Sequence, residues 1–114
     1  MPSSLRILIT TFADKKAATS VVRTLVKEKL IACGTLFPEA HSIYHWQGAI
    51  EETSEVVVWM KTSQALLEAC QQRLTELHPY DVPEVIVLEP SSVNLAYQVW
   101  AESALKRPGC DNAV

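Results

Sequence analysis

The sequence predicts an α+β domain in the order β-α-β-β-α-β, with a long extended hairpin and an added C-terminal helix. Short runs of apolar, β-branched residues alternate with stretches whose apolar residues recur at helical spacing. The 114 residues are 48% hydrophobic and 20% charged, which is typical of a folded globular chain. Because no linker divides the chain, we expect a single domain over 1–114, with its core in about 5–105 and a frayed tail over 107–114.

The first part of the chain predicts a strand, a helix and a second strand. The apolar run 5–11 is typical of a buried strand. Asp14 is suited to cap a helix, because its carboxylate can accept from the first free backbone N–H groups. The residues that recur at helical spacing behind it are Ala18, Val21, Val22, Leu25 and Val26. Residues 31–46 return to a strand pattern, with a bulge or local edge at Pro38, which cannot donate to a neighbouring strand.

A long β-hairpin is expected next. Gln47-Gly48 supplies a turn, and 50–61 continues as a second long strand. A strand from Ala49 to about Met60 spans roughly 40 Å at ~3.3 Å per residue. A compact domain of this size has a radius of gyration of about 13 Å and hence a diameter near ~35 Å. The aromatic hairpin tip should therefore overrun the domain, and we hypothesise that it contacts another copy of the chain.

The second half predicts a helix, a loop, a strand and a third helix. Ser63 is expected to cap a helix with one apolar stripe. That stripe consists of Leu66, Cys70, Leu74 and Leu77. The two prolines in 78–83 require a loop, and 84–89 reads as a short buried strand. Ser91 or Ser92 should start the last helix, which carries Leu95, Ala96, Val99 and Trp100. This order is the ferredoxin-like arrangement, with one antiparallel sheet and two helices on one face.

Composition excludes several classes of protein. Ten Lys and Arg against 13 Asp and Glu give a net charge of −3 without a basic patch, which disfavours nucleic acid and a polybasic membrane contact. The longest apolar run, 56–60, is far shorter than the ~20 residues of a membrane span, and no signal peptide is evident. Cys33, Cys70 and Cys110 are too widely spaced for a disulfide framework or a zinc motif. We expect reduced thiols and a cytoplasmic protein.

The polar residues with chemical potential lie on the hairpin and in the proline-rich loop. His78 is the sharpest candidate, because a helix C-terminus favours a protonated imidazole and the following loop leaves a ring nitrogen accessible. With Glu84 it would suit copper or zinc, although a helix-end histidine can equally bond the last carbonyls of its own helix. Lys61, at the end of an apolar run, is either an anion-binding residue or a strand-end charge.

Enzyme signatures are absent from the sequence. It contains no GxGxxG, P-loop, GxSxG or HExxH motif. An acylphosphatase-like enzyme shares this fold class, but Phe12-Ala13-Asp14 after the first strand lacks the arginine-bearing loop that would hold phosphate. The residues therefore indicate a binding protein that is not an enzyme.

Several motifs occur together in one order. They are Ala32-Cys33, Ser42-x-Tyr44-x-Trp46-x-Gly48-x-Ile50, Glu55, Lys61-Thr62 and His78-Pro79-Tyr80-x-Val82-Pro83-Glu84. This set resembles the CutA divalent-cation tolerance proteins over about residues 7–100. The resemblance implies a tight homotrimer whose hairpins wrap neighbouring subunits, with copper or another divalent cation at a cleft between subunits. The implied ligand-cleft residues are Tyr44, Trp46, Glu55, Lys61 and Tyr80, and the implied metal ligands are His78 and Glu84.

The chain differs from some members of that family in informative places. Those members carry a cysteine at the end of the first strand and a second histidine before the His-Pro-Tyr motif, where this chain has Ile9-Thr10-Thr11 and Leu77. A metal site here would then rest on His78 and carboxylates, with Cu²⁺ or Zn²⁺ as ligand and no required cofactor. Two alternatives remain open: a PII-like signalling sensor that binds a small anionic metabolite through Lys61, and a trimeric scaffold or anchoring protein.

Overall fold

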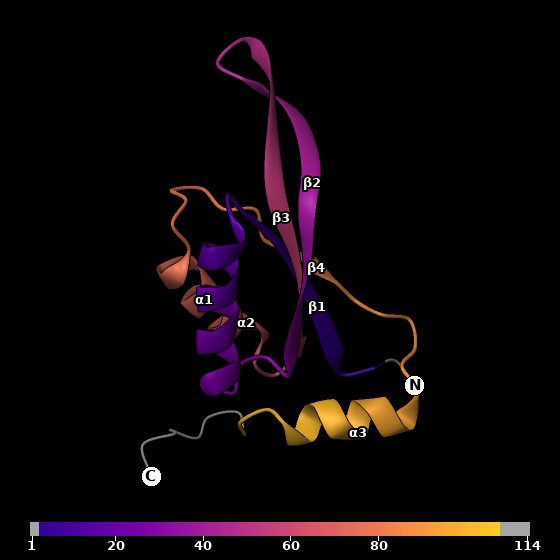
Figure 1. Ribbon diagram of the computed structural model, residues 1–114. Helices are drawn as coiled ribbons and strands as arrows, with labels where there is room; N and C mark the ends of the chain where they lie inside the picture. The colour runs from indigo at the N-terminus through magenta and orange to yellow at the C-terminus, as the bar shows by residue number, and fades with distance from the viewer. Residues whose placement is uncertain (1–2, 108–114) are drawn as a thin grey trace.

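The computed structural model describes residues 3–107 and has the predicted order of elements (Figure 1). The elements are β1 (Leu5–Phe12), α1 (Lys15–Lys27), β2 (Cys33–Trp46), β3 (Ala49–Ser63), α2 (Leu67–Leu77), β4 (Ile86–Leu88) and α3 (Leu95–Ser103). The α+β, ferredoxin-like fold with an added third helix is thereby confirmed. Apart from Arg107, the expected frayed tail lies outside the described residues.

The strands form one antiparallel sheet in the order β2-β3-β1-β4. Helices α1 and α2 cover one face of this sheet, and α3 crosses below its lower end (Figure 1). The face under α1 and α2 is built from alternate residues of the central strands, among them Leu8, Phe12, Val58 and Met60, all fully buried. The opposite face has no helix across most of its width.

Helix α1 matches its sequence pattern closely. The Asp14 carboxylate accepts a hydrogen bond from the Ala17 N–H at 2.8 Å, as predicted for an N-cap. The residues of α1 that are buried against the sheet are Ala18, Val21, Val22 and Leu25. Val26, predicted in the same stripe, is instead 41% exposed. The correction follows from helix geometry, because each residue turns the side chain by about 100° and Val26 falls past the edge of the buried face.

The hairpin of β2 and β3 has the predicted turn and interruption. The ladder runs from Cys33↔Lys61 to Trp46↔Ala49 and shifts register between Phe37 and Ala40, next to Pro38. At the tip, Gln47 and Gly48 have φ of 50° and 82°, and two positive φ values are what a tight two-residue hairpin turn requires. The upper half of the hairpin extends well past the rest of the domain (Figure 1), and with the hairpin the principal extents are 46 × 33 × 21 Å. The predicted overrun is confirmed.

Two predicted helix starts were wrong. Ser63 is the last residue of β3, and its hydroxyl accepts from the Leu66 N–H at 3.2 Å in a turn that precedes α2. Helix α2 itself begins at Leu67. Helix α3 begins at Leu95 after Asn94, several residues later than Ser91 or Ser92. In both cases the serine lies before the helix and does not cap it. Serine side chains stabilise turns as well as helix N-termini, so the local sequence does not show which of the two forms.

The last strand was predicted to be buried, and this was also wrong. Only Ile86–Leu88 pair with β1, and Ile86 and Leu88 are 47% and 40% exposed. The reason is topological, because β4 is an edge strand whose Val87 faces the core while its two neighbours face the side without helices.

Candidate functional site

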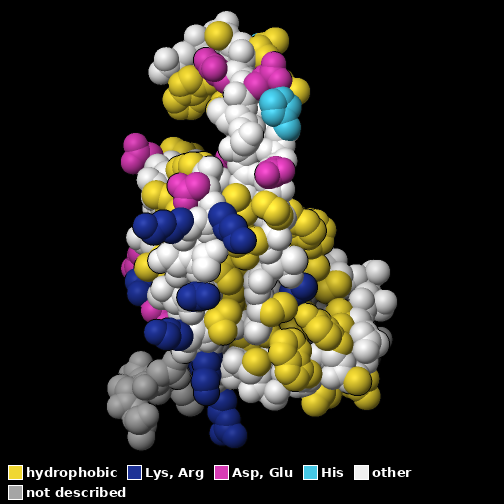
Figure 2. All heavy atoms as spheres, viewed as in Figure 1, with side chains coloured by type: hydrophobic (Ala, Val, Ile, Leu, Met, Phe, Trp, Pro, Cys, Tyr) yellow, Lys and Arg dark blue, Asp and Glu magenta, His cyan; other side chains and the backbone are white. Residues whose placement is uncertain are grey.

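A groove of about 1060 Å³ lies between the outer half of the hairpin and the loop that follows α2. In Figure 2 it corresponds to the notch between the hairpin tip and the body of the molecule. Its lining residues are Thr11, Ala13, Ser42, Ile43, Tyr44, Trp46, Thr53, Ser54, Glu55, Tyr80, Asp81, Val82 and Glu84. The groove is therefore formed by the end of β1, the two hairpin strands and the 80–84 loop.

Five of the seven predicted site residues line this groove: Tyr44, Trp46, Glu55, Tyr80 and Glu84. Lys61 does not. It pairs with Cys33 and Ile7 at the far end of β3, six residues from Glu55, which is roughly 20 Å along a strand. His78 is also absent from the lining, although it immediately precedes the loop that contributes Tyr80. The structure thus separates the one predicted cation from the groove.

Sequence reasoning passed over several groove residues. Asp81 lies in the proline-rich loop and lines the groove, but it was not among the predicted site residues. Ser42 and Thr53 are directly paired across the hairpin, and Ser42 lies two residues before Tyr44 on the same strand. Strand periodicity would have identified both residues. Residues i and i+2 of a strand lie on the same face, which places Ser42 beside Tyr44, and the residue paired with Ser42 across the hairpin lies on that face too.

The groove is strongly acidic. Its lining holds three carboxylates, Glu55, Asp81 and Glu84, and no lysine or arginine among the described residues. The surrounding sequence reinforces this, since neither 30–60 nor 74–105 contains a single Lys or Arg. A concave surface lined by one sign of charge concentrates counter-ions. The groove is therefore suited to a cation and unfavourable for an anionic metabolite.

One hydrogen bond joins the two walls of the groove. The Tyr80 hydroxyl donates to the Glu55 carboxylate at 3.2 Å, linking the loop to β3. Burial raises the pKa of Tyr80, and the neighbouring Glu55 charge raises it further. Tyr80 consequently stays protonated and remains a donor throughout the neutral range.

His78 is a buried support for the loop, and the expectation of an accessible, protonated ring was wrong. The residue is 7% exposed, and its ring stacks on Phe12 with ring centroids 4.3 Å apart. Nε2 lies 2.8 Å from the Thr11 carbonyl oxygen, and Nδ1 accepts from the Tyr80 N–H at 3.1 Å. Because a carbonyl only accepts and an amide N–H only donates, these contacts select the neutral ring with its proton on Nε2. His78 thus positions Tyr80.

We predict that this histidine makes folding stability depend on pH. Burial lowers the pKa of His78, although its bond to the Thr11 carbonyl opposes that shift. The unfolded chain, with an ordinary histidine pKa of about 6.5, then binds more protons than the folded one at mildly acidic pH. Stability should be level above about pH 7 and fall as the pH drops through about 6.5 toward the lower folded pKa.

Thermal unfolding of the protein across this pH range tests the prediction. His78→Gln should flatten the part of the profile that His78 produces, whatever its effect on absolute stability. His41→Gln is the matched control, since His41 is exposed, bonds Glu52 at 2.7 Å and makes no hydrogen bond to the loop. An unchanged profile in His78→Gln would assign the pH dependence to other groups.

No group of three or more His, Cys, Asp and Glu side chains converges to hold a metal within residues 3–107. The groove carboxylates lie on two walls of an open depression, Glu55 on β3 and Asp81 and Glu84 on the loop, and leave a bound cation partly uncoordinated by this chain alone. Cys33 and Cys70, the cysteines that the structure describes, are free thiols outside the groove. Among the same residues, no helix has the length and apolar character needed to cross a membrane.

Comparison with known proteins identifies relatives over most of the chain. The family described as CutA1 divalent ion tolerance protein matches residues 6–104. The divalent-cation tolerance protein CutA of Pyrococcus horikoshii is 45% identical over 101 residues, which cover 89% of this chain and 98% of that protein. Human protein CutA is 38% identical over 88% of this chain, and the match spans 56% of the human protein.

The fold agrees with the same relatives. The structure of CutA from Synechococcus elongatus superposes with a TM-score of 0.89 at 36% identity, covering 93% of this chain and 95% of that one. The matched region includes the hairpin, the 80–84 loop and therefore the whole acidic groove. The chain belongs to the CutA1 family of divalent ion tolerance proteins.

Proposed function

We propose that this protein is a cytoplasmic homotrimer that binds divalent cations, Cu²⁺ foremost and Zn²⁺ next, in its acidic groove, without catalysing a reaction or requiring a cofactor. The observation that carries this proposal is the groove lining, in which three carboxylates stand without a lysine or arginine. Oxygen ligands favour divalent cations, and Cu²⁺ is the most strongly held first-row divalent ion by a given set of ligands. The relatives named for divalent-cation tolerance support the same reading.

The groove residues divide into two roles in this proposal. The carboxylate oxygens for the cation come from among Glu55, Asp81 and Glu84, which do not converge as a set of three within one chain. Tyr44, Trp46 and Tyr80 form the walls, and Tyr80 keeps Glu55 oriented through its hydrogen bond. His78 does not contact the cation in this proposal; it holds the backbone at Tyr80 in place by accepting a hydrogen bond from the Tyr80 N–H. The ligands missing from one chain would come from a neighbouring subunit, which makes cation binding and assembly interdependent.

Calorimetric titration of metal-stripped protein with Cu²⁺ and with Zn²⁺ tests the cation site. We expect saturable binding to the natural protein and about a tenfold or greater loss of affinity in Glu55→Gln/Glu84→Gln, because neutral amides keep the shape but remove two charges. Glu68→Gln/Glu76→Gln, which removes the same charge from α2, should bind as the natural protein does. Equal binding by all three proteins would show that the metal binds nonspecifically at the protein surface, and it would contradict the proposal.

The open face of the sheet supports the trimer. Ile9 stands between Trp59 on β3 and Ile86 on β4, forming an apolar row on the side opposite Leu8 and Val58. The exposed apolar residues around this row are Phe37, Leu88, Val99 and Trp100. Figure 2 shows hydrophobic side chains gathered beside the sheet and around α3. Contiguous apolar surface of this kind is typical of a subunit interface.

Sizing by light scattering tests the assembly. We expect a trimer for the natural protein and monomers for Ile86→Glu, since a charge placed in an apolar interface loses its water without gaining a partner. Val26→Glu is the control, because Val26 is similarly exposed but lies on α1, at the opposite side of the sheet. A natural protein that sizes as a monomer, or an Ile86→Glu protein that remains a trimer, would contradict the assignment of this face.

A further inference from the structure

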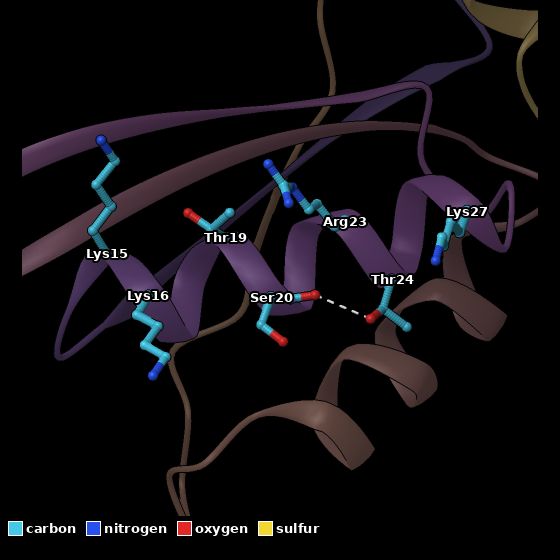
Figure 3. A pocket seen from close by; sticks show the side chains of 7 residues that line it. All are labelled: Lys15, Lys16, Thr19, Ser20, Arg23, Thr24 and Lys27. Carbon is cyan, nitrogen blue, oxygen red and sulfur yellow. Dashed lines mark hydrogen bonds between the residues drawn. The ribbon is translucent and has the colours of Figure 1, made fainter.

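The solvent side of α1 carries a positively charged surface that the cation groove does not use. Four cations, Lys15, Lys16, Arg23 and Lys27, and three hydroxyl residues, Thr19, Ser20 and Thr24, line a shallow depression of about 820 Å³. Figure 2 shows lysine and arginine side chains gathered over this helix, and Figure 3 shows the seven residues in two rows along it. We call this surface the α1 basic face.

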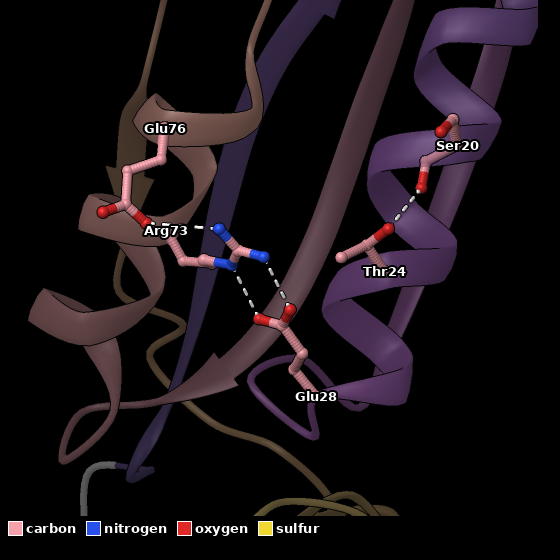
Figure 4. Close-up of polar contacts among 5 residues, drawn as sticks. All are labelled: Ser20, Thr24, Glu28, Arg73 and Glu76. Carbon is pink, nitrogen blue, oxygen red and sulfur yellow. Dashed lines mark hydrogen bonds and ion pairs between the residues drawn. The ribbon is translucent and has the colours of Figure 1, made fainter.

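The charges of this face are not neutralised by nearby carboxylates. No ion pair within residues 3–107 joins these four cations to an acidic side chain. Glu28, the one acidic residue near the end of α1, is turned toward α2, where its two oxygens accept from Arg73 at 2.9 and 2.8 Å (Figure 4). This bidentate pair directs the Glu28 charge away from Lys27 and Arg23. Within the described part of the chain, these cations therefore have no carboxylate partner and are available to an external anion.

Helical spacing brings residues distant in sequence onto one row. Lys15, Thr19, Arg23 and Lys27 are four residues apart, so their positions repeat about every 6 Å over a length of about 18 Å. No basic patch is evident in the sequence, because the cations of this row are separated along the chain by the half-buried residue 17, the buried residues 18, 21 and 22, and hydroxyl residues. Only the helix unites them, and the buried stripe of α1 fixes which side faces water.

We infer that the α1 basic face docks a short acidic segment of a partner protein. The row has four positions about 6 Å apart, which matches up to four carboxylates at helical spacing, and the Thr19 and Ser20 hydroxyls add neutral donors for the same oxygens. The Thr24 hydroxyl already donates to the Ser20 carbonyl oxygen at 3.0 Å. The face has no aromatic side chain on which a nucleic-acid base could stack. Glu68 and Glu76 on the neighbouring helix α2, together with the net charge of −3, oppose a longer polyanion that would extend past the face. No exposed apolar residue lines it that could enter a membrane.

The experiment measures the binding of a fluorescein-labelled peptide with glutamates at helical spacing by fluorescence polarisation. A peptide of equal length with glutamine at the same positions is the ligand control. We expect saturable binding of the acidic peptide alone, weakened by added salt. Lys15→Gln/Arg23→Gln should weaken it about tenfold, as the loss of two ion pairs predicts. Lys15→Arg/Arg23→Lys, which keeps both charges, should bind as the natural protein does.

Further arms distinguish a local site from a general charge effect. Gln47→Glu/Ser91→Glu lowers the net charge by the same two units at exposed positions away from α1 and should leave peptide binding unchanged. Equal weakening in this variant, or no saturable binding by the natural protein, would overturn the inference. Tighter binding of duplex DNA or phosphatidylserine vesicles than of the peptide would overturn the assignment of a protein partner. Salt-sensitive self-association that Lys15→Gln/Arg23→Gln abolishes would assign the face to a second copy instead.

Discussion

Replacing Phe12 with alanine should lower the free energy of unfolding by about 3–5 kcal/mol. Phe12 ends β1, is fully buried, and stacks on His78 at a centroid distance of 4.3 Å. Truncation removes a large apolar side chain from the core and leaves a cavity that the surrounding sheet and helices cannot fill. It also removes the ring on which His78 stacks, so the loop carrying Tyr80 loses part of its support from β1 and keeps only the hydrogen bond between His78 and the Thr11 carbonyl oxygen.

Urea denaturation at one fixed protomer concentration measures this effect, because assembly makes apparent stability depend on concentration. Phe12→Leu is the matched control and should cost less than about 1.5 kcal/mol, since it keeps most of the buried volume and loses only the aromatic contact. The two variants should also differ at the groove, where only Phe12→Ala weakens Cu²⁺ binding. A Phe12→Ala protein as stable as Phe12→Leu would show that the core relaxes around the missing ring.

The second large effect is expected at Gly34, where α1 packs directly on β2. A Cβ atom at this position would stand 2.6 Å from Cγ1 of Val22 and 3.4 Å from its Cγ2. Such a distance is far inside van der Waals contact, and Val22 is itself buried. Gly34→Ala should therefore destabilise the protein by about 1–3 kcal/mol through overpacking, even though alanine is otherwise the better residue in a strand.

A double-mutant cycle with Val22→Ala tests the cause. Shortening Val22 removes both methyl groups that the new Cβ would meet, so Gly34→Ala should cost far less in the Val22→Ala background than alone. The free energy of unfolding of all four proteins gives the coupling directly. Additive effects would show that the glycine is required for another reason than its contact with α1.

The candidate site was partly predictable because strand periodicity is local. Tyr44 and Trp46 alternate on one strand and Glu55 stands on its partner, so a predicted hairpin already brings them toward a common face. The resemblance to the CutA proteins grouped Lys61 with them, and the length of β3 separates it from the groove. His78 failed for a different reason: the helix dipole argument described its backbone position, while burial against Phe12 decided its ring environment.

By itself the sequence determined the elements and their order, because the signals that specify them act within a few residues. Asp14 caps α1, Gln47 and Gly48 adopt the positive φ of the hairpin turn, and the register shifts beside Pro38. The tertiary structure alone decided which apolar residues are left exposed on β4 and α3, which carboxylates share the groove, and which cations share α1's outer side. These outcomes depend on which strand is central, where each helix lies and how far the hairpin reaches, and such long-range pairing leaves no local trace in the sequence.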